Sequence, residues 1–490
     1  MSFELLQPMS LKKRLLIVMA VGLILRLGLL FVFWDEPLTI GDEIHYQRLA
    51  ENILNHHEFS YEEGQPHSLR PPFYPFFLSA VYFLTGGPSP NAVRIVQIFL
   101  SLGIMIVVYL FGKNAFDARI GILAAFIFAV YPSFIFFTHL LLSELLFTLF
   151  LLLFVYLFFK FLKEDSTGAE QSTFPNAKGF PYSNFSLSSN KNIRITFLTG
   201  LLLGLGALTR SGLFPFLFVA IIFVFFVCRG ILFERIKWVC ALSLGFVLVV
   251  SPWTVRNYIL FKDLVLIDTI GGMNLYLGNY EHTELHRAWA AIELTGDKAW
   301  FYGHEKVLSE MNEAQKHKWA INKAKEFILN HKWLTVKRAL VKAANFWGLE
   351  REVIGPIIKG KWARLNKPSY LVVITFLIFS TYGLVLVCSV FGLLFHLKFR
   401  NKGILLCVVL ILFFTGMHAV VYGHSRYHLP LMPLLAIFAS WAIMNIRIIW
   451  RFRHSWRQRV SMLLVASLIG VWVWEVLWVD GARFLKYVRM

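Results

Sequence analysis

The chain has 490 residues, of which 57% are hydrophobic and only 16% are charged, and its mean hydropathy is +0.61. This composition excludes an ordinary soluble domain and indicates a membrane protein. The net charge of +19 would also suit a nucleic-acid-binding protein. In so apolar a chain, however, basic loops that face anionic lipid are the better explanation, and we expect no nucleic-acid partner.

The four cysteines lie in or at the edge of apolar runs and form no C-x-x-C pair: Cys228, Cys240, Cys388 and Cys407. We therefore expect thiols within the apolar part rather than a disulfide framework or a metal site. Near the N-terminus, three cations at 12–14 precede an apolar run that has no small-residue cleavage site. This pattern predicts a first span that is not cleaved.

Apolar runs long enough to cross a bilayer recur along the chain. They predict an all-α polytopic membrane protein with about eleven transmembrane helices. The spans are expected near residues 15–34, 92–112, 118–137, 140–162, 195–210, 213–229, 235–251, 369–397, 403–421, 428–447 and 460–479.

The loops between these spans differ in charge. With a cytoplasmic N-terminus, the inner loops collect the cations, as the positive-inside rule requires. The first outer loop, residues 35–90, is instead rich in acids, among them Asp42, Glu43 and Glu51. One segment disagrees with the positive-inside rule, because the basic tail after Asp480 would lie on the outer side of the membrane. The last span is therefore the least secure.

Three regions follow from this pattern. Residues 1–251 form an N-terminal transmembrane module with the outer loop 35–90 and a flexible cytoplasmic loop at 164–194, which is rich in Ser, Asn, Gly and Pro. Residues 252–368 form an outer segment, helical from about 282 to 347 by its periodicity, as a domain or as helices on the membrane surface. Residues 369–490 are the C-terminal transmembrane helices. The short apolar stretch 70–84, broken by prolines, predicts an interfacial or re-entrant helix.

Polar clusters from distant parts of the chain fall on the same outer face. They are Asp42–Glu43, Ser143–Glu144, Thr209–Ser211, Trp253–Asn257 and His424–His428. Charged groups at a membrane face are costly unless they are solvated or functional. Their shared side predicts one outward-facing active site.

Asp42 and Glu43 directly follow the loop after the first span. They fit a general base, a metal ligand, or the acidic first turn of a surface helix, which the helix dipole favours. Neighbouring helical residues point roughly 100° apart. We therefore expect one acid to do the chemistry while the other orients it or binds metal.

Arginines in three of the clusters predict phosphate binding. Arg210 interrupts an apolar run, whereas Arg256 and Arg426 lie in SPWTVRN and HSRYHLP. Guanidinium groups match phosphate oxygens, although a snorkelling side chain at a span end is the alternative for Arg210. The neighbouring Trp253 and Tyr427 would alternatively be interfacial aromatics. The mid-span Arg26 would suit an internal acid as partner, but the sequence does not identify one.

Two further observations concern positioning. His424 and His428 are spaced i, i+4, which would suit a metal on one helix face, but no third ligand is adjacent. A divalent metal is therefore neither required nor excluded by the sequence. Glu144, at the top of a span, is expected to pair with an arginine or to position the acceptor, with a structural role as the alternative. No P-loop, dinucleotide or zincin motif is present.

Taken together, these short motifs resemble a known family. The Asp-Glu pair followed by Tyr46 and Arg70-Pro-Pro, the TRSG turn, SPWTVRN, the stretch from Gly271 and RYHLPLMP are similar to bacterial relatives of protein O-mannosyltransferases and of the lipid A aminoarabinose transferase. These are glycosyltransferases of the GT-C fold, in families 39 and 83. The resemblance covers about residues 10–445.

The resemblance implies a polyprenyl-phosphate sugar as donor and a membrane cavity open to the periplasm, in the bacterial inner membrane. It implies that Asp42, with Glu43, is the catalytic acid pair, and that Asp42 acts as base in an inverting displacement. Arginines would bind the donor phosphate: Arg70, Arg210, Arg256 and Arg426. Other side chains would position the substrates: Tyr46, Glu144, Asn257, His424 and Tyr427.

The function predicted on these grounds is transfer of a sugar to an envelope acceptor, either lipopolysaccharide or its lipid A, another glycolipid, or a protein. No MIR-type repeat is seen, which weighs against a protein acceptor without excluding it. A transporter or flippase of a lipid-linked sugar is the alternative, but it would be expected to show repeats and polar residues throughout its spans. An inactive relative that serves as an assembly partner is the third hypothesis.

Overall fold

The computed structural model describes residues 9–34, 36–171, 183–286, 288–397 and 401–480. Within these residues every regular element is a helix, and a single bridge between extended segments pairs Ser60 with Pro66. The predicted all-α polytopic fold is therefore confirmed.

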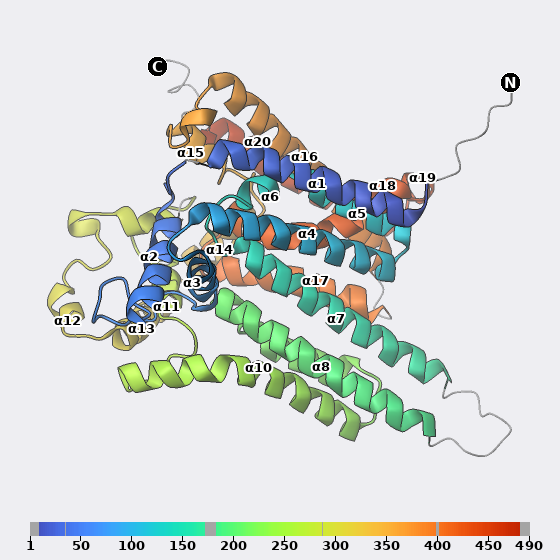
Figure 1. Cartoon of the computed structure of the whole chain (residues 1–490), viewed down its shortest axis with the longest axis horizontal. Coiled ribbons are helices and arrows are strands. Elements are labelled where there is room, and N and C mark those ends of the chain that lie inside the picture. Colours follow the sequence, from blue (N-terminus) through green and yellow to red (C-terminus); the bar gives the residue numbers. More distant parts are fainter. Residues whose placement is uncertain (1–8, 35, 172–182, 287, 398–400, 481–490) are drawn as a thin grey trace.

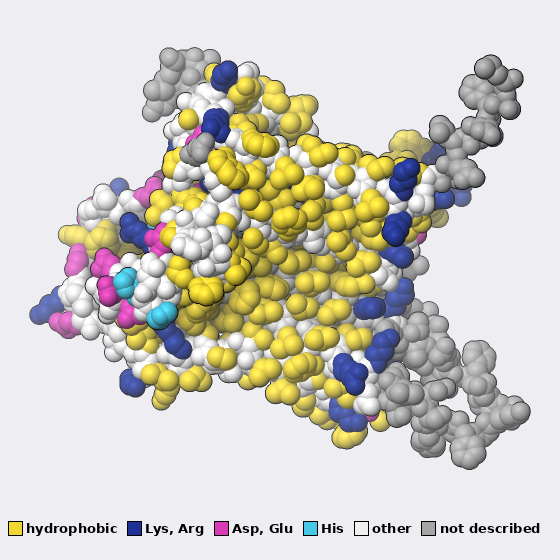
Figure 2. Space-filling view, viewed as in Figure 1, with side chains coloured by type: hydrophobic (Ala, Val, Ile, Leu, Met, Phe, Trp, Pro, Cys, Tyr) yellow, Lys and Arg dark blue, Asp and Glu magenta, His cyan; other side chains and the backbone are white. Residues whose placement is uncertain are grey.

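Nine helical segments in the described residues are long and apolar enough to cross a membrane. They run in nearly the same direction and carry the broad apolar surface of the molecule (Figures 1 and 2). They are α1 (Leu11–Phe33), α4 (Pro90–Ala115), α7 (Glu144–Gln171), α8 (Ser183–Thr209), α10 (Leu232–Phe261), α16 (Pro368–His396), α17 (Lys402–Val420), η5 with α18 (Ser425–Leu431 and Met432–Met444), and α20 (Trp456–Trp474) with its continuation η6 (Glu475–Asp480).

The count of eleven spans is not confirmed, because two of the predicted spans fall on shorter helices. One is α5 (Ala118–Val130), which breaks at Tyr131 before α6 (Pro132–Phe137). Proline has no backbone N–H to continue a helix, but it suits the first turn of a new one. The other is α9 (Phe216–Val227), which follows the 3₁₀ turn η1 (Ser211–Leu213).

The remaining helices, apart from α19 (Ile446–Arg451), belong to two segments between the candidate spans. The first holds α2 (Gly41–His56) and α3 (Phe73–Thr85), which is short, as the prolines before it predicted. The second holds α11 (Ile270–Gly278), η2 (Ala288–Glu293), η3 (Gly296–Lys298), α12 (Glu305–Ser309), α13 (Glu313–Asn330), α14 (Lys332–Phe346), α15 (Ile354–Ile358) and η4 (Ala363–Leu365). The labelled members α2, α3 and α11–α13 lie together at one end of the bundle (Figure 1).

Glycines let α8 and α10 approach closely. A Cβ at Gly200 would lie 2.0 Å from the carbonyl oxygen of Leu242, and one at Gly245 would lie 2.3 Å from that of Phe197. Helices in lipid gain most from such close backbone contact, since no hydrophobic force drives them together. The segment from α11 to η4 follows α10 directly in the chain.

Two expectations about the spans need correction. Among the described residues Arg26 pairs with no acid: it donates to Ser101 Oγ at 2.7 Å and to the carbonyl oxygens of Gly22 and Ala129 at 3.1 and 2.9 Å. The loop predicted at 164–194 is largely helical, because α7 continues to Gln171 and α8 begins at Ser183. Residues 172–182 lie outside the described residues.

Charge differs between the two ends of the bundle. Lys and Arg side chains gather at the end where α7 and α8 meet the undescribed segment, whereas most acidic side chains on this face lie over α2 and its neighbours at the other end (Figure 2). The four cysteines are all free, as expected.

Candidate functional site

The first turn of α2 places its two acids in different surroundings. Glu43 is buried, and its carboxylate accepts hydrogen bonds from the backbone N–H groups of Ile40 at 3.1 Å and Leu141 at 2.9 Å. Burial raises the pKa of Glu43, and these two N–H groups only partly oppose that effect. Glu43 therefore fastens α2 to the connection before α7, which fits the predicted orienting role. The catalytic role predicted for the pair would rest with Asp42.

Asp42 lies between two arginines. Its Oδ1 is 2.8 Å from Arg70 Nη2, and its Oδ2 is 2.9 Å from Arg426 Nη1. Burial alone would raise the pKa of Asp42, but the two guanidinium groups outweigh it and hold the pKa well below its usual value. The carboxylate is thus ionised, and 28% of its side chain is still exposed.

Glu144 continues this chain of charges from the first turn of α7. Its fully buried carboxylate is 2.5 Å from Arg210 Nη2 and in direct contact with Arg426 Nε. Arg210 also donates to Ser143 Oγ at 3.1 Å. The expected pairing of Glu144 with an arginine is confirmed. Arg426 therefore links the acid of α2 to the acid of α7.

The aromatic side chains predicted at the site lie against these arginines. The guanidinium of Arg70 is 5.4 Å from the ring of Tyr46, and that of Arg210 is 5.6 Å from the ring of Tyr427. Tyr427 stacks on His418 with ring centroids 4.6 Å apart. Cation–π contacts of this kind orient a guanidinium and still leave its N–H groups available. Direct positioning of substrate by these tyrosines stays a prediction.

An acid that the sequence analysis missed also reaches Arg426. Glu352, between α14 and α15, is 3.5 Å from Arg426 Nη1 and 3.8 Å from His424 Nε2. No pattern marks Glu352 in the sequence, because LEREV resembles the mixed-charge helices before it. Only the tertiary structure places the loop between α14 and α15 next to Arg426.

The two histidines do not form the metal site that their spacing left open. His424 caps the 3₁₀ helix η5 and His428 lies within it. Three residues make a turn of such a helix, so positions i and i+4 do not share a face. His428 is buried and contacts Phe346 O at 2.5 Å and Glu350 Oε1 at 3.2 Å. Among the described residues no group of three or more His, Cys, Asp or Glu side chains could hold a metal ion.

The SPWTVRN motif takes no part in the ion pairs that join Asp42 and Glu144 to the arginines. Arg256 donates to His67 O at 2.8 Å and to Ser68 Oγ at 2.7 Å. Asn257 is buried and donates to Val265 O and Ile267 O at 3.2 and 3.1 Å. Substrate contact by Arg256 and Asn257 stays a prediction, and these bonds give both residues a structural task.

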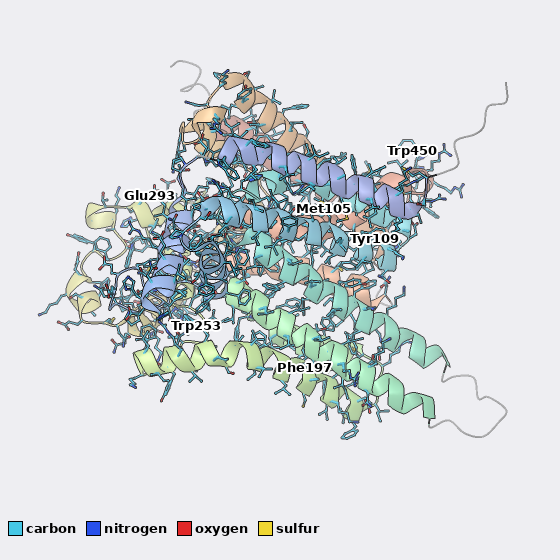
Figure 3. The ribbon with its side chains drawn as sticks, viewed as in Figure 1. Met105, Tyr109, Phe197, Trp253, Glu293 and Trp450 are labelled. Atoms are coloured by element: carbon cyan, nitrogen blue, oxygen red, sulfur yellow. The ribbon has the colours of Figure 1, made fainter. Side chains whose placement is uncertain are left out.

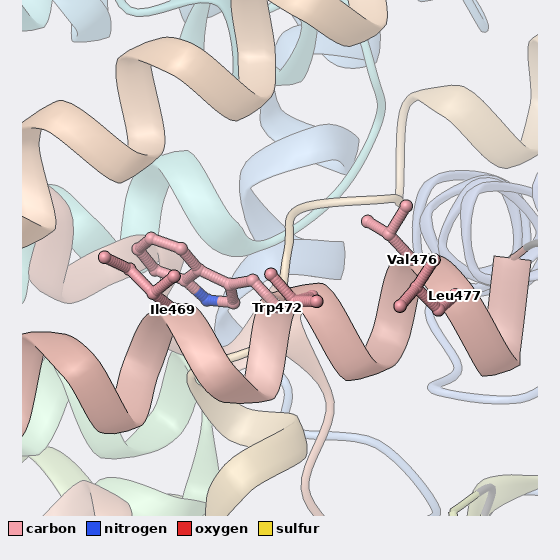
Figure 4. A pocket seen from close by; sticks show the side chains of 5 residues that line it. Ile469, Trp472, Val476 and Leu477 are labelled. Carbon is pink, nitrogen blue, oxygen red and sulfur yellow. The ribbon is translucent and has the colours of Figure 1, made fainter.

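A separate hollow of about 270 Å³ lies on α20 and is lined only by apolar side chains, among them Ile469, Trp472 and Leu477 (Figure 4). It contains none of the predicted site residues and no group that could bind phosphate. It therefore plays no part in the site.

Part of the chain is similar to a known protein family. Residues 69–169 match the family described as dolichyl-phosphate-mannose-protein mannosyltransferase. No curated protein matched the sequence.

Solved structures resemble most of the chain. The oligosaccharyltransferase AglB from Archaeoglobus fulgidus, in complex with an inhibitory peptide and a dolichol-phosphate, has a TM-score of 0.51 at 14% identity, over 94% of this chain and 54% of that one. Its apo form has a TM-score of 0.52 at 12% identity, over 95% and 55%. ArnT from Cupriavidus metallidurans, bound to undecaprenyl phosphate, has a TM-score of only 0.38 at 12% identity, over 87% and 77%.

The chain spans about half the length of the archaeal enzyme. At this identity the likeness concerns the fold, while the family match covers the segment from Leu69 through α3 and α4 into α7. The two agree with the resemblance drawn from the motifs. The chain is related to the GT-C glycosyltransferases, with a segment of the mannosyltransferase type and the fold of the archaeal oligosaccharyltransferase.

Proposed function

We propose that the protein is a membrane glycosyltransferase that moves one sugar from a polyprenyl phosphate to an envelope acceptor, either lipid A or another part of lipopolysaccharide, another glycolipid, or a protein. The observation that carries this proposal is the carboxylate of Asp42, held between Arg70 and Arg426 at 2.8 and 2.9 Å. A base and a pair of phosphate-binding groups are thus in direct contact.

The reaction is an inverting displacement. The acceptor hydroxyl attacks the anomeric carbon, the bond from that carbon to the phosphate oxygen breaks, and the polyprenyl phosphate leaves with the electron pair. The leaving group is already an anion, so it needs positive charge more than it needs a proton. Arg70, Arg210 and Arg426 provide that charge, with two or more N–H groups each.

Donor binding also changes Asp42. The incoming phosphate competes with Asp42 for Arg70 and Arg426, which are the groups that hold the pKa of Asp42 down. As these contacts weaken, the pKa of Asp42 rises toward its ordinary value and the carboxylate becomes a better proton acceptor. The acid therefore gains basicity when the donor is in place.

The proposed location is the inner membrane of a bacterium, with the site on the outer face. The acidic side chains gather over α2 and its neighbours, whereas the opposite end shows Lys and Arg with few acids, and this difference supports the orientation (Figure 2). The dolichol-phosphate in the AglB complex supports a lipid phosphate as the donor type.

The test is mass spectrometry of envelope glycolipids and glycoproteins from a deletion strain. Complementation with the wild-type gene should restore a mass difference of one sugar, and Asp42→Asn should not restore it. Glu62→Gln, which changes an exposed acid of the same outer segment, is the matched control. If Asp42→Asn restores the profile as well, Asp42 is structural and a transporter of lipid-linked sugar becomes the better hypothesis.

A further inference from the structure

We infer that Asp268 is a second acid–base group of the same site, which takes over the proton that Asp42 removes from the acceptor hydroxyl. This inference rests on the proposed function. It arises from a buried acid that takes part in no ion pair among the described residues, although it lies close to Arg70, the partner of Asp42.

Asp268 lies in the connection between α10 and α11. It is 8% exposed, and its Oδ2 has no hydrogen-bond partner within the described residues. Its other contacts are the hydroxyl of Ser211 and the backbone N–H of Gly271. Ser211 directly follows Arg210, so Asp268 lies beside the TRSG turn that places a phosphate-binding arginine. A buried carboxylate oxygen without a donor is costly unless it has a function.

The chain holds both neighbours of Asp268 in place. Ile267 O accepts from Trp253 Nε1 at 2.7 Å, and Thr269 N donates to Ser68 O at 2.9 Å. Trp253 lies on α10 near the polar end of the bundle (Figure 3). With Asn257 it forms the part of SPWTVRN that binds this connection. The motif therefore holds the connection that carries Asp268 in place.

The charged and titratable groups around this connection come from four elements. They are Arg70 before α3, Arg256 on α10, and Glu313 and His317 on α13, next to Ser211 of η1. Burial is the largest influence, and it raises the pKa of Asp268 to about 6, with Arg70 and the hydrogen bonds only partly opposing it. Asp42 is shifted the opposite way. Two carboxyl groups with pKa values pushed apart are the usual signature of divided acid–base roles.

In the step we infer, the acceptor oxygen forms its bond to the anomeric carbon as the polyprenyl phosphate leaves. Asp42 removes the hydroxyl proton and, because its pKa stays below that of Asp268, passes the proton on to the carboxylate of Asp268. Asp268 becomes a neutral acid and later releases the proton to water. No oxidant or further reactant is needed.

The experiment measures the pH dependence of transfer by the purified full chain, with a polyprenyl-phosphate sugar as probe. Wild type should lose activity as the pH falls through about 6, because Asp268 must be ionised to accept the proton. Asp268→Asn should lower kcat by about 100-fold or more and lack this acid limb, whereas Asp268→Glu should keep the limb. Asp42→Asn should be slow but keep the limb, since the pKa of Asp42 lies far below this range.

A second readout needs no turnover. The folded state binds the Asp268 proton more tightly than the unfolded state, so the melting temperature of wild type should fall as the pH rises from about 4 to about 6. Asp268→Asn should lack this component. Asp263→Asn changes an acid of the same connection that pairs with Lys318, and it is the matched control.

The outcomes separate the two proposals. An acid limb or a melting profile that is unchanged in Asp268→Asn overturns the role of Asp268 and leaves the proposed function standing. A wild type that transfers no sugar from any polyprenyl phosphate, although its melting profile shows the Asp268 titration, overturns the proposed function and the acid–base role with it.

Discussion

Three carboxylates converge on Arg426, those of Asp42, Glu144 and Glu352. The planar guanidinium fork can contact several oxygens at once, whereas an ammonium acts as a single point charge. Arg426 therefore both neutralises a concentration of acids and keeps them at fixed separations. Its identity as arginine matters as much as its charge.

Arg426→Lys tests that distinction. Because one ammonium cannot bridge Asp42 and Glu144, we expect kcat to fall by about 100-fold even though the charge is kept. Transfer kinetics with a polyprenyl-phosphate sugar would measure it, and Arg119→Lys, an exposed site at the other end of the molecule, should change nothing. A kcat equal to that of wild type would show that charge alone is sufficient.

A second prediction at this scale concerns Glu144. Its carboxylate is fully buried between Arg210 and Arg426. Glu144→Gln would leave buried positive charge uncompensated, which typically costs about 3–5 kcal/mol. Thermal unfolding in detergent should show a clear loss of stability, and Glu62→Gln serves as the exposed control. Equal melting temperatures for the two variants would contradict the buried ion pair.

At the scale of elements, the last helix supports the loop between α14 and α15. Glu475 accepts from Leu349 N at 2.9 Å and from Arg351 Nη1 at 3.0 Å. One turn earlier, Trp472 Nε1 donates to Trp347 O at 2.9 Å. The segment predicted as the last span, α20 with η6, thus holds the loop that brings Glu352 to Arg426.

Glu475→Gln should therefore act at a distance. It removes the charge from these hydrogen bonds, which are each worth about 1.5–3 kcal/mol, and frees the loop. We expect lower stability together with lower kcat, whereas Trp478→Phe on the exposed face of the same helical segment should leave both unchanged. If kcat is unaffected, the loop holds Glu352 without help from α20.

At the scale of the whole molecule, the bundle has a polar end with the candidate site and a basic end. The basic end has an ion pair and hydrogen bonds of its own, which hold its helices together. At the basic end Lys402 Nζ is 2.5 Å from Asp165 Oδ2, and the backbone N–H of Arg229 also points at this carboxylate. These contacts join the ends of α7, α9 and α17. The two ends therefore differ: the candidate site lies at one, and contacts that join the helices of the bundle lie at the other.

Cysteine labelling in intact cells tests the orientation of these ends. In a background without the four native cysteines, Glu62→Cys at the polar end should react with a membrane-impermeant thiol reagent. Lys113→Cys, which is also exposed but lies at the end of α4, should react only after the membrane is opened. Labelling in the reverse order would place the site in the cytoplasm and overturn the proposed envelope acceptor.

The sequence by itself determined the membrane class, the approximate position of every long helix, and the gathering of Asp42, Glu144, Arg210 and Arg426 at one end. Each segment enters the bilayer according to its own hydropathy, and each short loop stays on one side according to its own charge. Both properties can therefore be predicted from the local sequence. Only the tertiary structure decided which charged side chains pair with one another. Asp42 and Arg426 are 384 residues apart, and nothing local distinguishes Arg426 from Arg256, which the fold directs to Ser68 instead. Glu352 and Asp268 became visible for the same reason, since burial and pairing are properties of the packed chain.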